Sequence, residues 1–350
     1  MQNTIKKDDI LFDVYGRRFG YRMFDANYLT EDIYSFLAAE KDAFSNFLDL
    51  DKFDTVIEVG CGYGRYTKTV IEQEKQYVGI DLISWLIEFG DWYSSVSNSM
   101  VGSESITLKT LSIVNIESLI LNANFKKPVV FLPFNCLGNL SYFETVVQTL
   151  SKLGITIACS LFNDHKTTTK SRLEYYDKCG LTGLHNQNFD TGAVITSTEG
   201  FDSVGYNLVY FENFMKKYGY LKKDSFDLNG FGGLFLFEQK QVSLVQTVKP
   251  KQPISLDTYE DRLARTSLDE IKNLPKRFSV KKIYYVDWVR AQKNSVYQAT
   301  GLLPFDFKTV KSFEEILVDE DYKKPHTSPM GVVELFDHEM QDCLFYPIKL

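Results

Sequence analysis

The segment that most constrains the fold is a glycine-rich turn between a short apolar strand and a helix. Residues 55–59 read TVIEV, a β-branched run typical of a buried strand, and glycines follow at positions 60, 62 and 64. Helix character begins near Tyr66. Glycine is needed where a chain turns sharply with a positive φ angle, or where a bound molecule must approach the backbone. The pattern therefore predicts a strand, a turn and a helix whose free N–H groups face a ligand.

Strand-like and helix-like segments alternate after this turn. Apolar strands are predicted at 77–80, 106–114, 128–132 and 155–162, helices at 82–93, 142–153 and 208–218, and a closing antiparallel hairpin at 219–228 and 232–240. Alternation of this kind builds a parallel sheet with right-handed crossovers. We therefore expect an α/β fold with a doubly wound, mostly parallel seven-stranded sheet and a C-terminal accessory region.

The chain is also long enough to divide into parts, because a core of 350 residues tends to split. Residues 1–50 show apolar residues at helical spacing and predict an N-terminal helical cover. Residues 51–240 carry the alternating strands and helices. Within them, 163–207 is polar and glycine-rich, and predicts an insertion that covers the substrate. A proline-containing segment, 241–254, predicts a linker to an accessory domain of unknown role at 255–350.

The charge of the chain disfavours generic nucleic-acid binding. The formal net charge is −7 and the pI is about 5.3, so the protein repels polyanions at long range. One basic run could contact an anion: Lys272, Lys276, Arg277, Lys281 and Lys282. The five cysteines lack metal-ligand spacing, and no run of about 18 apolar residues occurs. We expect a cytoplasmic protein without a membrane partner or a metal ion.

The acidic residues around the glycine turn indicate the kind of ligand. Asp81 ends the second strand, where its carboxylate can accept hydrogen bonds from both hydroxyls of a ribose. A dinucleotide-binding turn reads G-x-G-x-x-G, whereas this turn reads G-x-G-x-G, with Glu58 two positions before its first glycine. The arrangement resembles motif I of the class I S-adenosylmethionine-dependent methyltransferases.

The resemblance covers roughly residues 53–240 and implies a Rossmann-like methyltransferase domain. It also implies S-adenosyl-L-methionine as the cofactor and S-adenosyl-L-homocysteine as the product. The segment 132–140, LPFNCLGNL, looks like the PFN-x-x-GN version seen in some small-molecule methyltransferases. Asn115 departs from the acidic residue often found at its position. The cofactor-binding residues implied by the resemblance are Glu58, Gly60, Cys61, Gly62, Gly64, Asp81, Leu82, Asn115, Ile116, Phe134 and Asn135.

The candidates for the acceptor side rest on weaker patterns. His165 and His185 follow the fifth strand and are the candidates for proton removal, although histidines are more often ordinary surface or core groups. Aromatic rings that could line the sulfonium and acceptor pocket, or simply belong to the core, are Tyr15, Tyr21, Tyr28 and Tyr142.

The sequence therefore predicts methyl transfer to an O or N atom of a small-molecule acceptor by in-line displacement. A sulfonium methyl is already electrophilic, so no nucleophilic side chain or metal is required. One alternative keeps the chemistry but takes a protein or RNA acceptor, recruited through 255–350. A second is a sensor or scaffold that binds S-adenosylmethionine without catalysis. The sequence leaves open whether the chain forms a homo-oligomer.

Overall fold

The computed structural model describes most of the sheet-bearing part of the chain and shorter stretches of the C-terminal part. The described residues are 10–11, 14–16, 20–46, 52–97, 105–123, 125, 127–140, 142–239, 278–285, 294–303, 330–337 and 342–349. The predicted linker 241–254 lies outside these residues, as do Lys272, Lys276 and Arg277 of the basic run.

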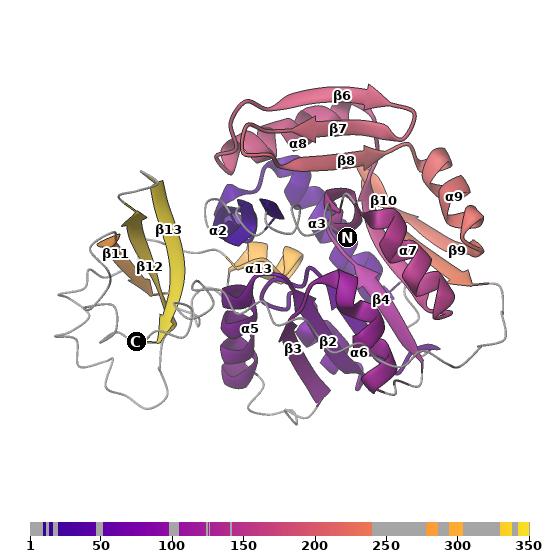
Figure 1. Ribbon diagram of the computed structural model, residues 1–350, viewed down its shortest axis with the longest axis horizontal. Coiled ribbons are helices and arrows are strands. Elements are labelled where there is room, and N and C mark those ends of the chain that lie inside the picture. Colours follow the sequence, from indigo (N-terminus) through magenta and orange to yellow (C-terminus); the bar gives the residue numbers. More distant parts are fainter. Residues whose placement is uncertain are drawn as a thin grey trace.

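A seven-stranded sheet forms the centre of the fold (Figure 1). Its strands are β1 (Thr55–Val59), β2 (Gln76–Asp81), β3 (Ile106–Thr110), β4 (Pro128–Leu132), β5 (Thr156–Phe162), β9 (Tyr220–Asp227) and β10 (Gly232–Gln239). The strand order is β3-β2-β1-β4-β5-β10-β9. Strands β1 to β5 pair in parallel, and β10 runs antiparallel to both β5 and β9. The predicted mostly parallel sheet, with its closing hairpin, is confirmed.

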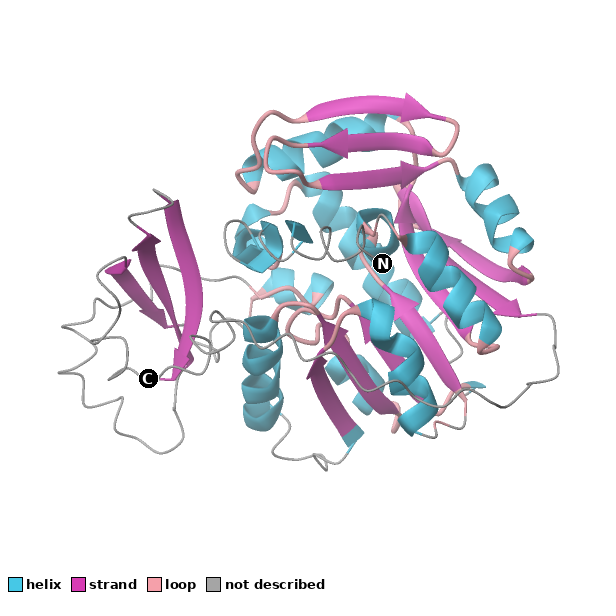
Figure 2. Ribbon diagram, viewed as in Figure 1, coloured by secondary structure: helices cyan, strands magenta, loops and turns pink. Residues whose placement is uncertain are grey.

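Helices cover both faces of this sheet, as expected for a doubly wound fold (Figure 2). The helices on one face are α3 (Glu31–Asn46), α4 (Thr67–Ile71) and α5 (Ser84–Ser97). Those on the other face are α6 (Ile116–Ala123), α7 (Phe143–Lys152) and α9 (Leu208–Lys217). Because the central strands are covered on both sides, their sequences are almost continuously apolar.

The N-terminal segment contributes helix α3 to one of these faces. Thr30 caps the helix, since its Oγ1 accepts a hydrogen bond from the Ile33 N–H at 3.4 Å. The side chains of Phe36, Leu37 and Phe44 are fully buried against the sheet. The predicted helical lead-in therefore forms. Before it, the structure describes a short helix, α2 (Gly20–Met23), and a 3₁₀ turn, η2 (Ala26–Tyr28).

The polar segment after β5 is more regular than its sequence indicates. It contains helix α8 (Lys166–Lys178) and an antiparallel sheet of β6 (His185–Phe189), β7 (Gly192–Thr196) and β8 (Asp202–Tyr206). These strands have only five residues each, and β6 is largely exposed, so they carry little apolar signal. The small sheet lies at the carboxyl end of β5, where Asn163 bridges to Tyr206 (Figure 1).

The third strand is shorter than its apolar run predicts. It ends at Thr110 instead of position 114, and a 3₁₀ turn, η5 (Ile113–Asn115), follows. The Leu111 N–H donates to the Asp81 backbone carbonyl at 2.8 Å, which keeps the two strand ends together. The chain then bends at Ser112, so the last apolar residues of the run belong to the turn and not to the strand.

The C-terminal part contributes a second small sheet and a piece of the main core. Strands β11 (Phe278–Tyr285), β12 (Met330–Asp337) and β13 (Asp342–Lys349) form an antiparallel sheet beside α5 (Figure 1). Helix α13 (Ser295–Thr300) instead packs against α3, and Leu303 after it is fully buried in the main core. No helix in the described part of the chain is long and apolar enough to cross a membrane.

Candidate functional site

The turn between β1 and α4 has the left-handed backbone conformation that its glycines predict. Gly60, Gly62 and Gly64 have φ angles of +66°, +56° and +83°, all in the left-handed region. The Gly60 and Cys61 N–H groups both donate to the Ile80 carbonyl, at 2.9 and 3.2 Å, which holds the turn against β2. A Cβ on Gly60 would lie 2.9 Å from Cys136 Sγ, so the glycine keeps a narrow space open at the strand ends.

Asp81 fixes the turn from the end of β2. Its Oδ2 accepts a hydrogen bond from the Gly62 N–H at 2.8 Å, and its Oδ1 accepts one from the Ile83 N–H at 2.9 Å. Burial raises the pKa of Asp81 to about 6, and these two hydrogen bonds partly offset the effect. Since a carboxylate offers roughly four acceptor positions, Asp81 can still accept hydrogen bonds from a ligand.

Glu58 lies behind the turn instead of facing a ligand directly. Its side chain is buried in β1 and accepts a hydrogen bond from the Tyr77 hydroxyl. Burial raises the pKa of Glu58 to about 8, although the bond from Tyr77 and one from the Tyr66 backbone act in the opposite direction. A positive group close to Glu58 would lower this pKa again.

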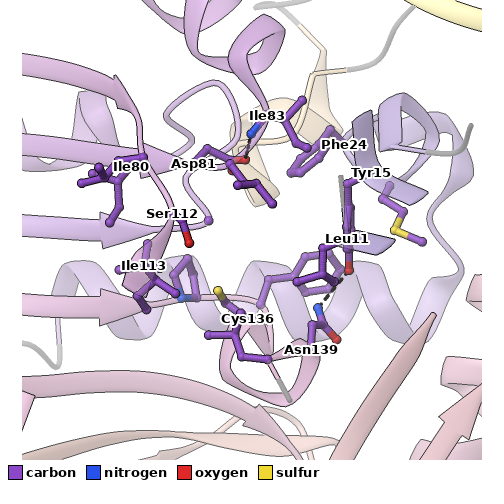
Figure 3. Close-up of a pocket in the computed structure, with 18 of the residues that line it drawn as sticks. Leu11, Tyr15, Phe24, Ile80, Asp81, Ile83, Ser112, Ile113, Cys136 and Asn139 are labelled. Carbon is purple, nitrogen blue, oxygen red and sulfur yellow. Dashed lines mark hydrogen bonds between the residues drawn. The ribbon is translucent and has the colours of Figure 1, made fainter. Parts of the chain in front are cut away.

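A cavity of about 140 Å³ opens at the carboxyl ends of the central strands (Figure 3). Gly60, Asp81, Leu82, Ser112 and Ile113 line the part next to the glycine turn. The other part is mainly aromatic, and its rings are Tyr15, Phe24, Phe134, Phe162, Tyr175 and Tyr176. Figure 3 shows Asp81 and Ile83 at one side and Leu11, Tyr15 and Asn139 at the other. Open α/β sheets bind their ligands at this edge.

Only some of the site residues predicted from the sequence line the cavity. Those that line it are Gly60, Asp81, Leu82, Phe134, Tyr15 and Tyr142. Those that do not line it are Glu58, Cys61, Gly62, Gly64, Asn115, Ile116, Asn135, Tyr28, His165 and His185. Both histidines are exposed, and Tyr28 lies under the Arg22 guanidinium at 5.5 Å. The side chain of Tyr21 is outside the described residues.

The loop after β4 is strained at two consecutive positions. Phe134 and Asn135 have φ angles of +47° and +56°, an arrangement that costs free energy in residues with a Cβ. Asn135 is buried, and its Oδ1 accepts from the Phe162 N–H at 3.1 Å while its Nδ2 donates to the Val204 carbonyl at 3.0 Å. These bonds join the loop to β5 and β8. Asn135 therefore bonds to protein groups and does not line the cavity.

Glu40 of α3 is a part of the site region that sequence reasoning missed. Its side chain is fully buried and forms an ion pair with Arg65, the residue after the last glycine of the turn. Its carboxylate also accepts hydrogen bonds from the Tyr66 hydroxyl at 2.7 Å, the Phe134 N–H at 2.6 Å and the Ser160 hydroxyl. Glu40 lies on the apolar face of its helix, and that position is the one sequence signal for its burial.

Tyr175 and Tyr176 are also missing from the sequence-based prediction. They lie on α8, inside the segment that reads as polar, yet both side chains are buried and line the cavity. The Tyr175 hydroxyl donates to the Met23 carbonyl at 3.0 Å. The sequence signal that could have found them is a pair of tyrosines three and four residues after Arg172, which places all three on one face of the helix.

The cavity wall has few groups that can donate or take up a proton. Asp81 is its one carboxylate, and no lysine or histidine among the described residues lines it. Burial raises the pKa of the Cys136 thiol, which keeps that group neutral. The described residues also contain no group of three His, Cys, Asp or Glu side chains that could hold a metal ion.

Comparison with known proteins gives similar folds at low identity. No protein-family model and no curated protein matches the sequence. A Burkholderia thailandensis 1,6-didemethyltoxoflavin-N1-methyltransferase structure is 13% identical over 59% of this chain and 79% of that chain, with a TM-score of 0.40. The CcbJ methyltransferase from Streptomyces caelestis is 13% identical over 65% and 98%, with a TM-score of 0.42. Magnesium protoporphyrin IX methyltransferase from Synechocystis PCC 6803 is 10% identical over 57% and 81%, with a TM-score of 0.39. Likeness at this level does not assign an activity.

Proposed function

We propose that the protein transfers the methyl group of S-adenosyl-L-methionine to a small-molecule acceptor by in-line displacement. The observation that carries this proposal is the turn of three left-handed glycines bonded to Asp81 beside an aromatic-walled cavity. The G-x-G-x-G spacing and the preceding Glu58 favour an adenosyl sulfonium over a nicotinamide dinucleotide.

The residues around the turn fit the parts of such a cofactor. Asp81 retains acceptor positions that a ribose diol can fill. Leu82 and Ile113 line the same part of the cavity and offer apolar surface to a purine ring. Glu58 lies close behind the turn. A positively charged amino group of the ligand near its carboxyl would lower the pKa of Glu58 and favour the carboxylate. Gly60 lines the cavity without a side chain, and the Cys136 side chain lies close to the position that a Cβ would take.

The cofactor supplies an electrophilic methyl group on a sulfonium, and the chain's own residues orient the reactants and exclude water. The aromatic rings of the cavity present negative faces, which favour a nearby positive charge. Tyr15 and Phe134 belong to this wall and come from the N-terminal segment and the loop after β4. No step is assigned to His165 or His185, because both are exposed and outside the cavity wall.

Calorimetric titration with S-adenosyl-L-methionine and S-adenosyl-L-homocysteine tests the cofactor assignment. We expect both to bind wild-type protein, and we expect Asp81→Ala to bind them at least about tenfold more weakly. Asp224→Ala is the matched control, since Asp224 is exposed on β9 and its side chain accepts a hydrogen bond from the N–H of its neighbour Ser225, away from the cavity. Absence of binding to wild-type protein would refute the proposal.

Untargeted mass spectrometry of metabolites, proteins and RNA nucleosides that gain a methyl group tests the acceptor. A methylated metabolite that disappears with Asp81→Ala supports the small-molecule proposal. A methylated protein or RNA would instead favour recruitment through residues 255–350. Cofactor binding without any methylated product would favour the sensor, so each alternative has its own outcome.

A further inference from the structure

Beside the aromatic part of the cavity, an arginine is buried without a carboxylate partner. Arg172 of α8 is fully buried, and no ion pair forms between it and any described carboxylate. Its guanidinium donates to the Ala193 carbonyl at 3.2 Å and the Ser203 carbonyl at 2.7 Å, and its Nε has no partner among the described residues. Burying an uncompensated charge is costly, and burial accordingly lowers the pKa of Arg172.

The fold makes room for this arginine specifically. A Cβ on Gly205 would lie 2.4 Å from the guanidinium Nη1, so any larger residue there would displace it. The guanidinium also lies 5.5 Å from the ring centroid of Phe162, which lines the cavity. The positive charge therefore lies one side chain behind the cavity wall.

A hydrogen-bonded chain connects the arginine to the cavity through Ser203. The Ser203 Oγ lies 3.0 Å from Arg172 Nη2, 3.4 Å from Asn135 Nδ2 and 2.9 Å from the Tyr176 hydroxyl. The arginine is always a donor, and the Asn135 amide is fixed as a donor there because its Oδ1 accepts from the Phe162 N–H. The Ser203–Tyr176 contact allows either hydroxyl to donate, and because Arg172 and Asn135 occupy both lone pairs of the Ser203 oxygen, we assign Ser203 as the donor.

The direction of this chain leaves the Tyr176 hydrogen without a protein acceptor. The Tyr176 oxygen accepts from Ser203 and also hydrogen-bonds the Arg172 guanidinium, which can only donate, so neither contact uses the tyrosine hydrogen. Tyr176 lines the cavity, so its O–H can serve a ligand there. Tyr15, on the same wall, accepts from Asn139 Nδ2 at 3.0 Å and has a hydroxyl hydrogen to donate as well (Figure 3).

Several other ionisable groups lie around these tyrosines. Burial raises the pKa values of Tyr15, Tyr175, Cys136 and Cys179, so these groups stay protonated. Asp81 is an anion on the cavity wall, and its two oxygens are engaged by the glycine turn and the start of α5. The charged groups that act on Cys179, which are Asp25, Arg22 and Lys178, do not line the cavity. Two hydroxyl donors with a cation behind them complement a negatively charged oxygen.

We propose that the acceptor is an aromatic molecule bound through a phenol-type oxygen, held as the phenolate by the Tyr15 and Tyr176 hydroxyls with Arg172 behind them. This proposal rests on the methyltransferase function proposed above. The acceptor releases its proton to solvent on binding. A lone pair of the phenolate oxygen then forms the new O–C bond while the C–S bond breaks, and its electron pair leaves with sulfur as a neutral thioether. The cavity wall therefore needs no general base.

Absorbance of bound nitrophenols tests the proposal directly. The probes are 4-nitrophenol and its ring-substituted analogues of graded acidity, added to the full-length protein with and without S-adenosyl-L-homocysteine. We expect the bound probe to ionise at a pH at least about one unit below that of the free probe, a tenfold shift. We expect Tyr176→Phe to remove most of this shift and Ser203→Ala to reduce it.

Tyr220→Phe is the matched control, because it also removes a buried tyrosine hydroxyl, one that bonds the Ile155 carbonyl away from the cavity. Probes bound as neutral phenols, a shift that survives in Tyr176→Phe, or failure of every probe to bind would each overturn the proposal. Different measurements refute the two proposals. Absence of cofactor binding in the calorimetric titration would refute the methyltransferase function. The absorbance of the bound probe, which is measured with and without S-adenosyl-L-homocysteine, tests the phenolate site alone.

Discussion

Glu40 of α3 accepts a 2.6 Å hydrogen bond from the backbone N–H of Phe134, in the loop after β4. The same carboxylate pairs with Arg65, directly after the glycine turn. One buried side chain therefore joins the N-terminal helix to two loops that line the cavity. The position of these loops depends on Glu40, which lies fifteen positions before Thr55, the first residue of β1.

Replacing Glu40 with glutamine should destabilise the protein by about 3 kcal/mol, because Arg65 would remain buried without its partner. Chemical unfolding in urea, followed by circular dichroism, measures the change. Glu72→Gln is the control, since the Glu72–Lys68 pair is exposed at 3.7 Å and should contribute less than about 1 kcal/mol. Equal effects of the two substitutions would contradict the role given to Glu40.

Gly60→Ala and Gly154→Ala form a matched pair with φ angles of +66° and +67°. Both should lose about 1 kcal/mol of stability because alanine is strained in the left-handed region, and Gly60→Ala should lose more because its Cβ would lie 2.9 Å from Cys136 Sγ. A Cβ at Gly154 meets nothing within 4 Å, whereas one at Gly60 meets Cys136 in the cavity. We expect only Gly60→Ala to weaken S-adenosyl-L-homocysteine binding, by at least about tenfold, in a calorimetric titration. Unchanged affinity would remove Gly60 from the binding surface.

The pKa of Glu58, raised by burial to about 8, predicts a pH-dependent stability. Because the folded state holds this proton more tightly than the unfolded state, stability should fall as the pH rises from about 4.5 to about 8. The loss should amount to roughly 4 kcal/mol. Glu58→Gln cannot ionise, so its melting temperature should fall less than that of wild type between pH 5 and pH 8. Parallel curves for the two proteins would rule out Glu58 as the source.

Asn135→Leu should cost about 2 to 4 kcal/mol, because the Phe162 N–H and the Val204 carbonyl would lose their buried partner. Urea unfolding measures this loss. Asn122→Leu, at an exposed site that bonds only Ser118, should have little effect. If Asn135→Leu weakened cofactor binding while leaving stability intact, Asn135 would be the direct cofactor contact that the sequence resemblance implies.

The elements that follow local patterns are predictable from the sequence. Alternating apolar runs identified the central strands, since each run is a contiguous segment whose burial depends on its own residues. The glycine spacing predicts the left-handed turn for a similar reason, because the freedom of Gly60, Gly62 and Gly64 to adopt positive φ angles is a local property. Asp81 follows from its place at the end of a strand, and it lines the cavity.

The parts that escaped prediction depend on contacts between distant segments. Glu40 is an ordinary helical glutamate until α3 packs beside Arg65 and Phe134. Tyr176 lies in a polar stretch, and it contacts Ser203 and lines the cavity only when α8 packs beside β8. The short strands of the insertion pair with one another instead of burying long apolar runs, so neither period nor composition marks them.

Leu303 shows that the folding unit extends well beyond the last strand of the sheet. Its N–H donates to the Tyr63 hydroxyl at 2.7 Å and its carbonyl accepts from the Ala26 N–H at 3.0 Å. In a polypeptide cut after β10, the Tyr63 hydroxyl and the Ala26 N–H would both lose their hydrogen bonds to Leu303. The apolar surface that Leu303 covers, directly beside the glycine turn, would also be exposed. Limited proteolysis is therefore not expected to release an intact sheet domain, and a heterologous fusion should retain the chain through position 303.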